Sequence, residues 1–121
     1  MALITTAGVH LKSDQPFDMK DPSGDPSFRQ IPADVDPGAL TITHNYYDHS
    51  DADKDVNIVF PVERIRELAA LDEIGAVNQR HFSFMGHVLP PHIDTLMHRT
   101  SLEVALALKN DGVDLAILTP T

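Results

Sequence analysis

Three short apolar runs, separated by two helical patterns, organise this chain. The runs cover residues 2–6 (ALITT), 80–86 (RHFSFMG) and 115–118 (LAIL), and the first ends at Ala7-Gly8. Short runs rich in β-branched and aromatic residues are typical of strands that are buried on both faces of a parallel sheet. We therefore predict three buried strands.

The first helical pattern occupies residues 62–75, after an expected short strand or extended segment at residues 57–60. Pro61 stands at the position of a first helical residue, where its missing N–H is not needed. Gly75 is the expected end of the helix, because glycine is common just after a last helical turn. One face is apolar and the opposite face is charged. The apolar positions are Val62, Ile65, Leu68 and Ala69.

The second helical pattern runs from Thr100 to Asn110 and has almost no polar face. Thr100 and Glu103 have the spacing of a capping box, and Gly112 follows the pattern. A helix that is apolar nearly all round is normally covered on all sides. Three strands and two helices cannot provide that cover, so we expect the chain to associate with further protein. The apolar positions are Leu102, Val104, Ala105, Leu106, Ala107 and Leu108.

The order strand, helix, strand, helix, strand predicts an α/β fold with mostly parallel strands and right-handed crossovers. We expect a three-layer sheet of Rossmann-like or flavodoxin-like type, forming a single, incomplete domain over residues 1–121. The segment from residue 11 to residue 57 has five prolines and many Asp and Ser residues, which favour turns. Because buried-type side chains recur within it, we expect this acidic segment to be a long, ordered loop.

Composition narrows the functions open to the chain. Its 121 residues carry a formal net charge of −9, which argues against nucleic acid or an anionic membrane as partner. No apolar run reaches the roughly 18 residues that a membrane span needs. The opening MALITTAGVH lacks the features of a signal peptide, so we expect a cytoplasmic protein. The absence of cysteine excludes disulfides, thiolate metal sites and a thiol nucleophile within these residues.

The candidate binding site follows from the strand prediction, because ligands of open parallel sheets bind outside the carboxyl ends of the strands. Gly8 follows the first predicted strand, Met85 and Gly86 end the second, and Thr119 and Thr121 follow the third. We predict that these five residues contact a small-molecule substrate, which the glycines would let the backbone approach closely. The alternative is that the glycines only end the strands.

Titratable side chains add candidate chemistry near these strand ends. His10 could act as a base, bind substrate or pack within a loop. The stretch HNYYDHSDADKD, residues 44–55, is the densest polar cluster of the chain. It could bind a metal through imidazole and carboxylate groups, form a polar substrate or interface loop, or consist of Asp residues that stabilise turns.

We predict that residues 44–55 fold over the carboxyl ends of the strands and wall a crevice that contains His10. Asp51 or Asp53 would offset the positive charge of a substrate amino group. His10 or His49 would transfer a proton near neutral pH. We assign no metal ligand in this chain.

Several long stretches together resemble one protein family. They are ITTAGVHLKSDQPFD, GDPSFRQIP, YDHSDADKDVNIVFPVERIRELA, HFSFMG and DGVDLAILTPT, which span nearly the whole chain. These stretches are similar to component B of the glycine, sarcosine, betaine and D-proline reductases, a family of selenoproteins and their cysteine variants. The resemblance implies reductive cleavage of a C–N bond in a small amino acid, with a thiol or selenol as electron donor.

The resemblance also implies where the redox group lies. In that family the strand matching residues 115–118 leads into a segment with selenocysteine or cysteine, and further βα units complete the domain. This sequence stops at Thr121, before such a residue, as the upstream half of a self-cleaved subunit or a shortened reading frame would. We therefore expect no cofactor in the chain, and a selenocysteine, cysteine or pyruvoyl group on a partner or following segment.

These expectations define the partners and two alternative functions. The partners are a small amino-acid-like substrate and either further copies of the chain or a complementary reductase subunit. The first function is the substrate-binding part of a reductase, inactive in isolation. The second is a non-catalytic binding or regulatory module of the same fold.

Overall fold

The computed structural model describes residues 1–121 and has a four-stranded sheet, in the order β3-β5-β1-β6, at its centre. β1 is parallel to both β5 and β6, while β3 is antiparallel to β5. A second, two-stranded antiparallel sheet pairs β2 with β4. The predicted α/β fold with mostly parallel strands is confirmed. The strands are β1 Ala2–Thr5, β2 Val9–Leu11, β3 Phe28–Pro32, β4 Leu40–Ile42, β5 Arg80–Phe84 and β6 Ala116–Thr119.

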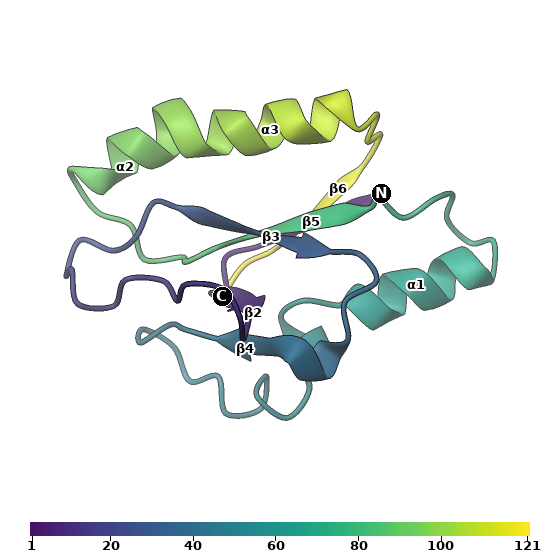
Figure 1. The fold of residues 1–121 in the computed structure, drawn as a ribbon, viewed down its shortest axis with the longest axis horizontal. Coiled ribbons are helices and arrows are strands. Elements are labelled where there is room, and N and C mark those ends of the chain that lie inside the picture. Colours follow the sequence, from purple (N-terminus) through teal and green to yellow (C-terminus); the bar gives the residue numbers. More distant parts are fainter.

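Helices lie on both faces of the central sheet (Figure 1). One face carries a continuous helical segment, and the other carries α1 together with the small β2–β4 sheet. The assignment to the three-layer Rossmann-like type remains a prediction. The helices are α1 Val62–Ala70, α2 His92–Thr95, the π-helical η3 Leu96–Thr100 and α3 Ser101–Asn110, with short 3-10 helices η1 Pro37–Ala39 and η2 Val56–Ile58.

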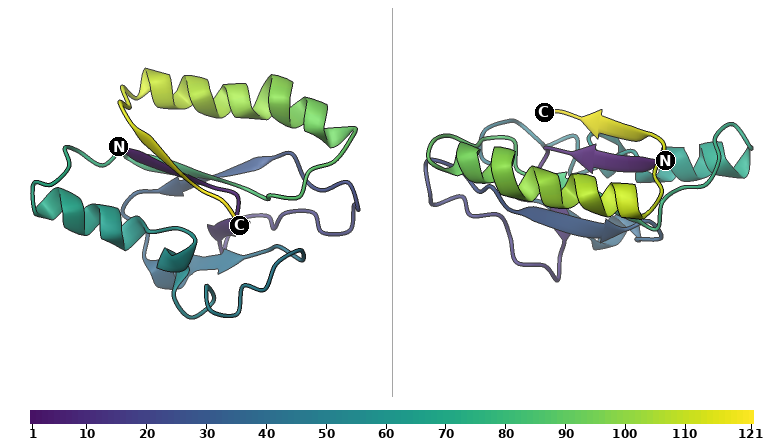
Figure 2. Two further views of the ribbon diagram at one scale, coloured as in Figure 1. Left: turned by 180° about the vertical axis from the view of Figure 1, so that it is seen from behind. Right: turned by 90° about the horizontal axis from the view of Figure 1, so that it is seen from above.

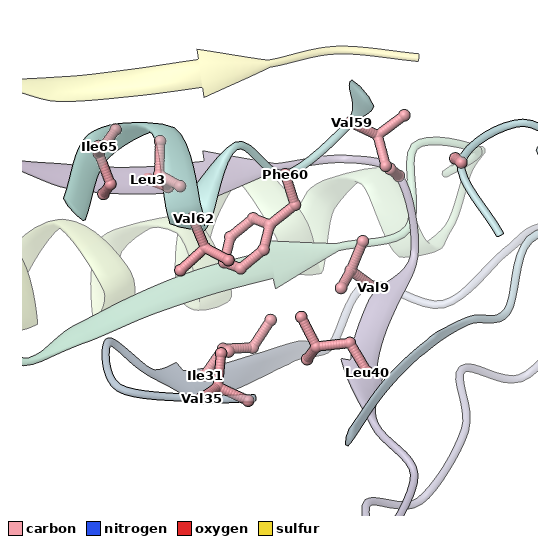
Figure 3. Packing of buried hydrophobic residues seen from close by; sticks show 11 residues of the cluster. Leu3, Val9, Ile31, Val35, Leu40, Val59, Phe60, Val62 and Ile65 are labelled. Carbon is pink, nitrogen blue, oxygen red and sulfur yellow. The ribbon is translucent and has the colours of Figure 1, made fainter. Parts of the chain in front are cut away.

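Two apolar clusters hold the layers together, because side chains alternate between the two faces of each strand. On β1, Leu3 joins the cluster beneath α1 and the β2–β4 sheet, whereas Ala2 joins the cluster beneath α3. Figure 3 shows the first cluster, in which Phe60 and Val62 meet Leu3 and Ile31. The second cluster sets Phe82 and four further residues against one another: Ala2, Phe84, Val104 and Leu108.

Helix α1 is shorter than the sequence pattern predicted. Val62 and Ile65 are buried as expected, but Leu68 is 40% exposed. The helix ends at Ala70 rather than at Gly75, and Asp72 follows in the left-handed region with φ of 57°. The predicted apolar face therefore stops after about one turn of buried contact.

The second helix begins earlier than predicted. It runs without a break from His92 to Asn110, with a π-helical turn at Leu96–Thr100. Thr100 has helical backbone angles and makes no capping bond, so the capping-box interpretation was wrong. Its buried hydroxyl instead donates to the carbonyl of Pro26 at 2.7 Å. No helix of the chain has both the length and the apolar character that crossing a bilayer requires.

The segment from residue 11 to residue 57 contains regular structure that the turn-rich sequence did not predict. β3 pairs along the edge of the central sheet, and β4 pairs with β2. Arg66 of α1 holds this segment in place by donating to the carbonyls of Ala33 and Val35 at 2.6 and 2.7 Å. The expected short strand or extended segment at residues 57–60 is also corrected, since Val56–Ile58 forms a 3-10 helix.

Candidate functional site

The carboxyl ends of β1 and β5 are bonded to each other rather than spread apart. Ala7 forms an antiparallel bridge with Met85, and the Gly8 N–H donates to the carbonyl of Phe84 at 2.9 Å. Gly8 has φ of 73°, and a Cβ there would lie 2.4 Å from the carbonyl oxygen of Thr43. Glycine is therefore needed at this position for the close approach of the chain to itself.

A cavity of about 480 Å³ opens where β1, β5 and β6 end beneath the long helix. Met85 and Gly86, two of the predicted substrate contacts, line it. Most of its other lining side chains are apolar, with Thr6 and Ser101 as the hydroxyl groups. The cavity is large enough for a small amino acid and lies where ligands of parallel sheets bind.

Thr119 and Thr121 do not line this cavity or any other in the structure. The Thr119 hydroxyl donates to the Val59 carbonyl at 2.7 Å, next to the Thr5 hydroxyl, which donates to the same carbonyl at 2.9 Å. These bonds fasten β1 and β6 to the segment that leads into α1. Thr121 is exposed.

His10 is buried on β2, and both of its ring nitrogens are engaged within the chain. Nδ1 lies 2.7 Å from the carbonyl of Leu11, and Nε2 lies 2.8 Å from the hydroxyl of Thr43. Its ring packs edge-on against Phe17. No cavity of the structure is lined by His10, so the expected crevice around it is not seen.

His49 and Asp53 form a partly exposed pair in the loop of residues 44–55. Nδ1 of His49 lies 2.8 Å from the Asp53 carboxylate, which leaves Nε2 without a partner in the chain. Asp51 is more exposed and pairs with Lys54 at 2.8 Å. A carboxylate on Nδ1 fixes the ring orientation and tautomer, so Nε2 is the nitrogen that can exchange a proton with a ligand.

Asp53 also lines a second, polar cavity of about 440 Å³, between β4 and the loop. Lys12, Lys54 and Asp55 face the same space, so both signs of charge are present. Met85 and Gly86 line the apolar cavity instead. The structure thus divides the predicted site between two separate cavities.

His44 and its aromatic neighbours connect the loop to the strand ends. Its ring packs edge-on against Tyr46 and Tyr47, and Tyr46 stacks on His87 with ring centroids 3.8 Å apart. The Tyr47 hydroxyl donates to the carbonyl of Ala7 at 3.0 Å. The adjacent Tyr46 and Tyr47 were the sequence signal for this contact between the loop and the strand ends.

Burial favours the neutral forms of His44 and Tyr47. Burial, and then the nearby His49 and His87, lower the pKa of His44. Burial, and then the Asp53 carboxylate, raise the pKa of Tyr47 to about 12. Both side chains are therefore neutral near pH 7 and act as packing groups that hold the loop against the ends of β1 and β5.

The Asp residues of the loop stabilise turns. Asp48 accepts the N–H of Ser50 at 3.0 Å, and Asp55 accepts the N–H of Asn57 at 3.0 Å. Across the chain, no three His, Asp or Glu side chains converge as ligands of a metal ion would. Turn stabilisation therefore explains the presence of Asp48 and Asp55. Of the titratable side chains of the loop, the His49–Asp53 pair remains as the candidate for proton transfer.

Comparison with known proteins agrees with the resemblance seen in the sequence. The family model described as glycine/sarcosine/betaine reductase selenoprotein B matches residues 1–121. D-proline reductase subunit gamma of Acetoanaerobium sticklandii is 38% identical over 119 residues, which is 98% of this chain and 47% of that protein. The chain thus spans about half the length of this curated relative. No solved structure matches. The chain belongs to the glycine/sarcosine/betaine reductase selenoprotein B family.

Proposed function

We propose that this chain is the substrate-binding part of a reductase that cleaves a C–N bond of a small amino acid. The observation that carries the proposal is the cavity of about 480 Å³ at the carboxyl ends of the parallel strands, in a chain of the reductase family. Ligands of open parallel sheets bind at these ends. The proposed setting is the cytoplasm, within a complete domain of three-layer Rossmann-like type.

The electrons must come from outside these residues, because the chain contains no cysteine. Cleavage replaces the C–N bond by C–H and N–H bonds, so it consumes two electrons and two protons. A thiol or selenol pair supplies them and is oxidised to a disulfide or selenosulfide. The proposal places that pair on a partner or a following segment, where a pyruvoyl group could lie in addition to it, and gives this chain the tasks of binding and proton supply.

Of the two candidate catalytic histidines, we assign proton transfer to His49 rather than to His10, although His49 lines neither cavity and would have to reach the substrate from the loop of residues 44–55. Nε2 of His49 is free, and Asp53 positions the ring through Nδ1 at 2.8 Å. Both nitrogens of His10 are engaged within the chain. Asp51, which is exposed, would offset the charge of a substrate ammonium group.

The proposed substrate class is supported by the lining of the cavity and by the names of the relatives. Met85 and Gly86 bound a mainly apolar space, which suits a compact substrate with a hydrocarbon body. The name of the curated relative refers to D-proline, and that of the family refers to glycine, sarcosine and betaine. We propose D-proline as the first candidate, since its ring offers apolar surface to such a lining. Reductive cleavage would open that ring to a linear amino acid.

A second function, a non-catalytic binding module, is supported by the absence of any thiol in the chain. Binding of D-proline without turnover, even after addition of the redox-bearing part of the enzyme, would favour it. Substrate-dependent oxidation of a dithiol by the reassembled enzyme would exclude it.

The proposed binding site is tested by a substitution on the long helix that fills the cavity. Ser101→Phe places a ring in the cavity, and Ser13→Phe places the same ring on an exposed turn as a matched control. We expect the first variant to weaken D-proline binding by roughly tenfold or more, and the second to leave it unchanged. Calorimetry with D-proline, glycine, sarcosine and betaine measures both. Equal affinities for Ser101→Phe and the unmodified chain would refute this placement of the substrate.

A further inference from the structure

The apolar cavity contains one side-chain polar group that the chain itself leaves without a partner, the hydroxyl of Thr6. The other hydroxyl of the lining, that of Ser101, donates to the carbonyl of Met97 in its own helix at 3.2 Å. The only sealed side-chain polar atom without a partner is Nε2 of His81, so the free Thr6 hydroxyl is open to the cavity. A polar group left free at the end of an apolar face needs an explanation.

The neighbouring threonines show that the fold does not require this hydroxyl. Thr5 and Thr119 both donate to the carbonyl of Val59, on the face of the sheet that α1 covers. Because side chains alternate along a strand, Thr6 lies on the opposite face together with Ile4, which also lines the cavity. Valine has the same shape and the same preference for extended backbone as threonine. The polar atom of Thr6 is therefore not explained by packing or by local structure.

Gly86 keeps the space beside Thr6 open. Its φ is not positive, so the backbone conformation does not call for glycine at this position. A Cβ on Gly86 would lie 3.1 Å from the carbonyl oxygen of Thr6 and 3.3 Å from its Cβ, which is closer than ordinary packing allows. The N–H of Gly86 lies 3.3 Å from Nε2 of His44. Gly86 thus lies between Thr6 and the loop that carries His49 and Asp51.

We propose that Thr6 is a substrate-binding residue, whose hydroxyl donates to the carboxylate of the amino-acid substrate. This assignment rests on the proposed function, in which the substrate ammonium group faces Asp51 and receives its proton from His49. With the amine directed towards the loop, the carboxylate is the polar group left to the cavity. A hydroxyl that donates to a carboxylate makes a charge-assisted bond, which is stronger than a bond between neutral groups. The hydrocarbon body of the substrate packs against the apolar lining.

The second carboxylate oxygen keeps its contact with water, because the cavity is open towards β6. Met97 and Leu118 border the cavity and are 57% and 68% exposed. Figure 2 shows β6 at the edge of the sheet, beyond the cover of α3. A carboxylate that Thr6 holds at this opening therefore avoids the high cost of a charge buried without partners.

Substitution of Thr6 tests the assignment by calorimetry with D-proline. Thr6→Val preserves the shape of the side chain and removes the hydroxyl, so it should weaken binding by roughly tenfold or more. Thr6→Ser keeps the hydroxyl and should retain most of the affinity. Thr41→Val is the matched control, because Thr41 is also partly buried and lies on a strand but lines the polar cavity. It should leave the affinity unchanged.

Two analogues of D-proline identify the group that Thr6 binds. Cyclopentanecarboxylate keeps the carboxylate and lacks the amine, whereas pyrrolidine keeps the amine and lacks the carboxylate. In titrations followed by NMR, Thr6→Val should weaken cyclopentanecarboxylate as strongly as D-proline and should leave pyrrolidine unchanged. The opposite pattern would show that Thr6 accepts from the amine, and it would overturn the assignment.

The outcomes separate this assignment from the proposed function. Circular dichroism checks that each variant is folded. If Ser101→Phe abolishes D-proline binding while Thr6→Val binds as the unmodified chain does, the role of Thr6 alone is refuted. Binding that depends on the Thr6 hydroxyl, without reductive cleavage by the reassembled enzyme, would refute the proposed function alone. Absence of binding of both carboxylates to the unmodified chain would overturn both.

Discussion

His81 is buried on β5 in a state that only a neutral imidazole can maintain. Its Nδ1 accepts the N–H of Leu3 at 3.1 Å, and its Nε2 has no hydrogen-bond partner. The ring packs edge-on against Phe60. Burial, followed by the positive charges of Arg66 and the amino terminus, lowers the pKa of His81 to about 4. Protonation would place a charge in the core and remove the acceptor of β1.

The pKa shift predicts a loss of stability between pH 6.5 and pH 4. The folded-state pKa of His81 lies below the ordinary value of 6.5, so the unfolded chain binds the proton first as the pH falls. Stability that is present above pH 6.5 is therefore lost on acidification. The difference corresponds to about 3 kcal/mol of unfolding free energy at pH 4. That is a large share of the roughly 5–15 kcal/mol that stabilises an ordinary domain.

Urea unfolding of the chain and of His81→Asn, at a series of pH values from 7 to 4.5, measures this effect. Asn offers an acceptor to the Leu3 N–H but does not titrate. We expect the unmodified chain to lose roughly 2–3 kcal/mol more than the variant over this range. His44, whose pKa is also lowered, is present in both proteins and cancels from the difference. Equal losses in the two proteins would refute the reasoning.

Three further changes test separate features of the fold. Gly8→Ala should lower the free energy of unfolding by at least about 3 kcal/mol, because it adds a backbone clash to the strain of positive φ. Gly112→Ala, where φ is similar but the space is open, should lower it by only about 1 kcal/mol. Thermal unfolding compares the two variants. Thr100→Val should cost about 1–2 kcal/mol by leaving the Pro26 carbonyl without its donor, and Thr100→Ser should restore most of it in the same assay. Tyr47, with a pKa of about 12, should remain un-ionised near pH 10.5, so Tyr47→Phe should not reduce the tyrosinate absorbance at that pH.

The strands of the central sheet could be predicted from the sequence wherever they are buried on both faces. β1 and β5 are apolar runs because helices or the second sheet cover both of their sides. The third predicted strand is present as β6, but it lies at the edge of the sheet and none of its residues is buried, so the prediction that it is buried was wrong. β3 was missed because it lies at the edge, buries only Ile31 and ends at Pro32. Its pairing depends on β5, which follows it by about fifty residues, and local composition cannot report such a partner.

The candidate site was predicted in part, for a similar reason. Met85 and Gly86 line a cavity because they lie at the carboxyl end of a parallel strand, where ligands of such sheets bind. The orientation of His10 depends on β2 pairing with β4, which turns the imidazole towards Thr43 and away from any cavity. The pairing of His49 with Asp53 depends on a helical turn of the loop, which brings residues four apart together. Neither contact has a signature in residue order alone.

The position of β1 has a consequence for how the chain is made. β1 lies between β5 and β6, and Ala2 is in register with Ala116. A ribosome adds about 5–20 residues per second, so β6 is synthesised roughly ten seconds after β1. During that interval the sheet can form only between β1, β3 and β5, and the pairing with β6 must close a very long loop. Among the strands of residues 1–121, the one that borders the proposed substrate cavity is thus added last, to a sheet that is already assembled.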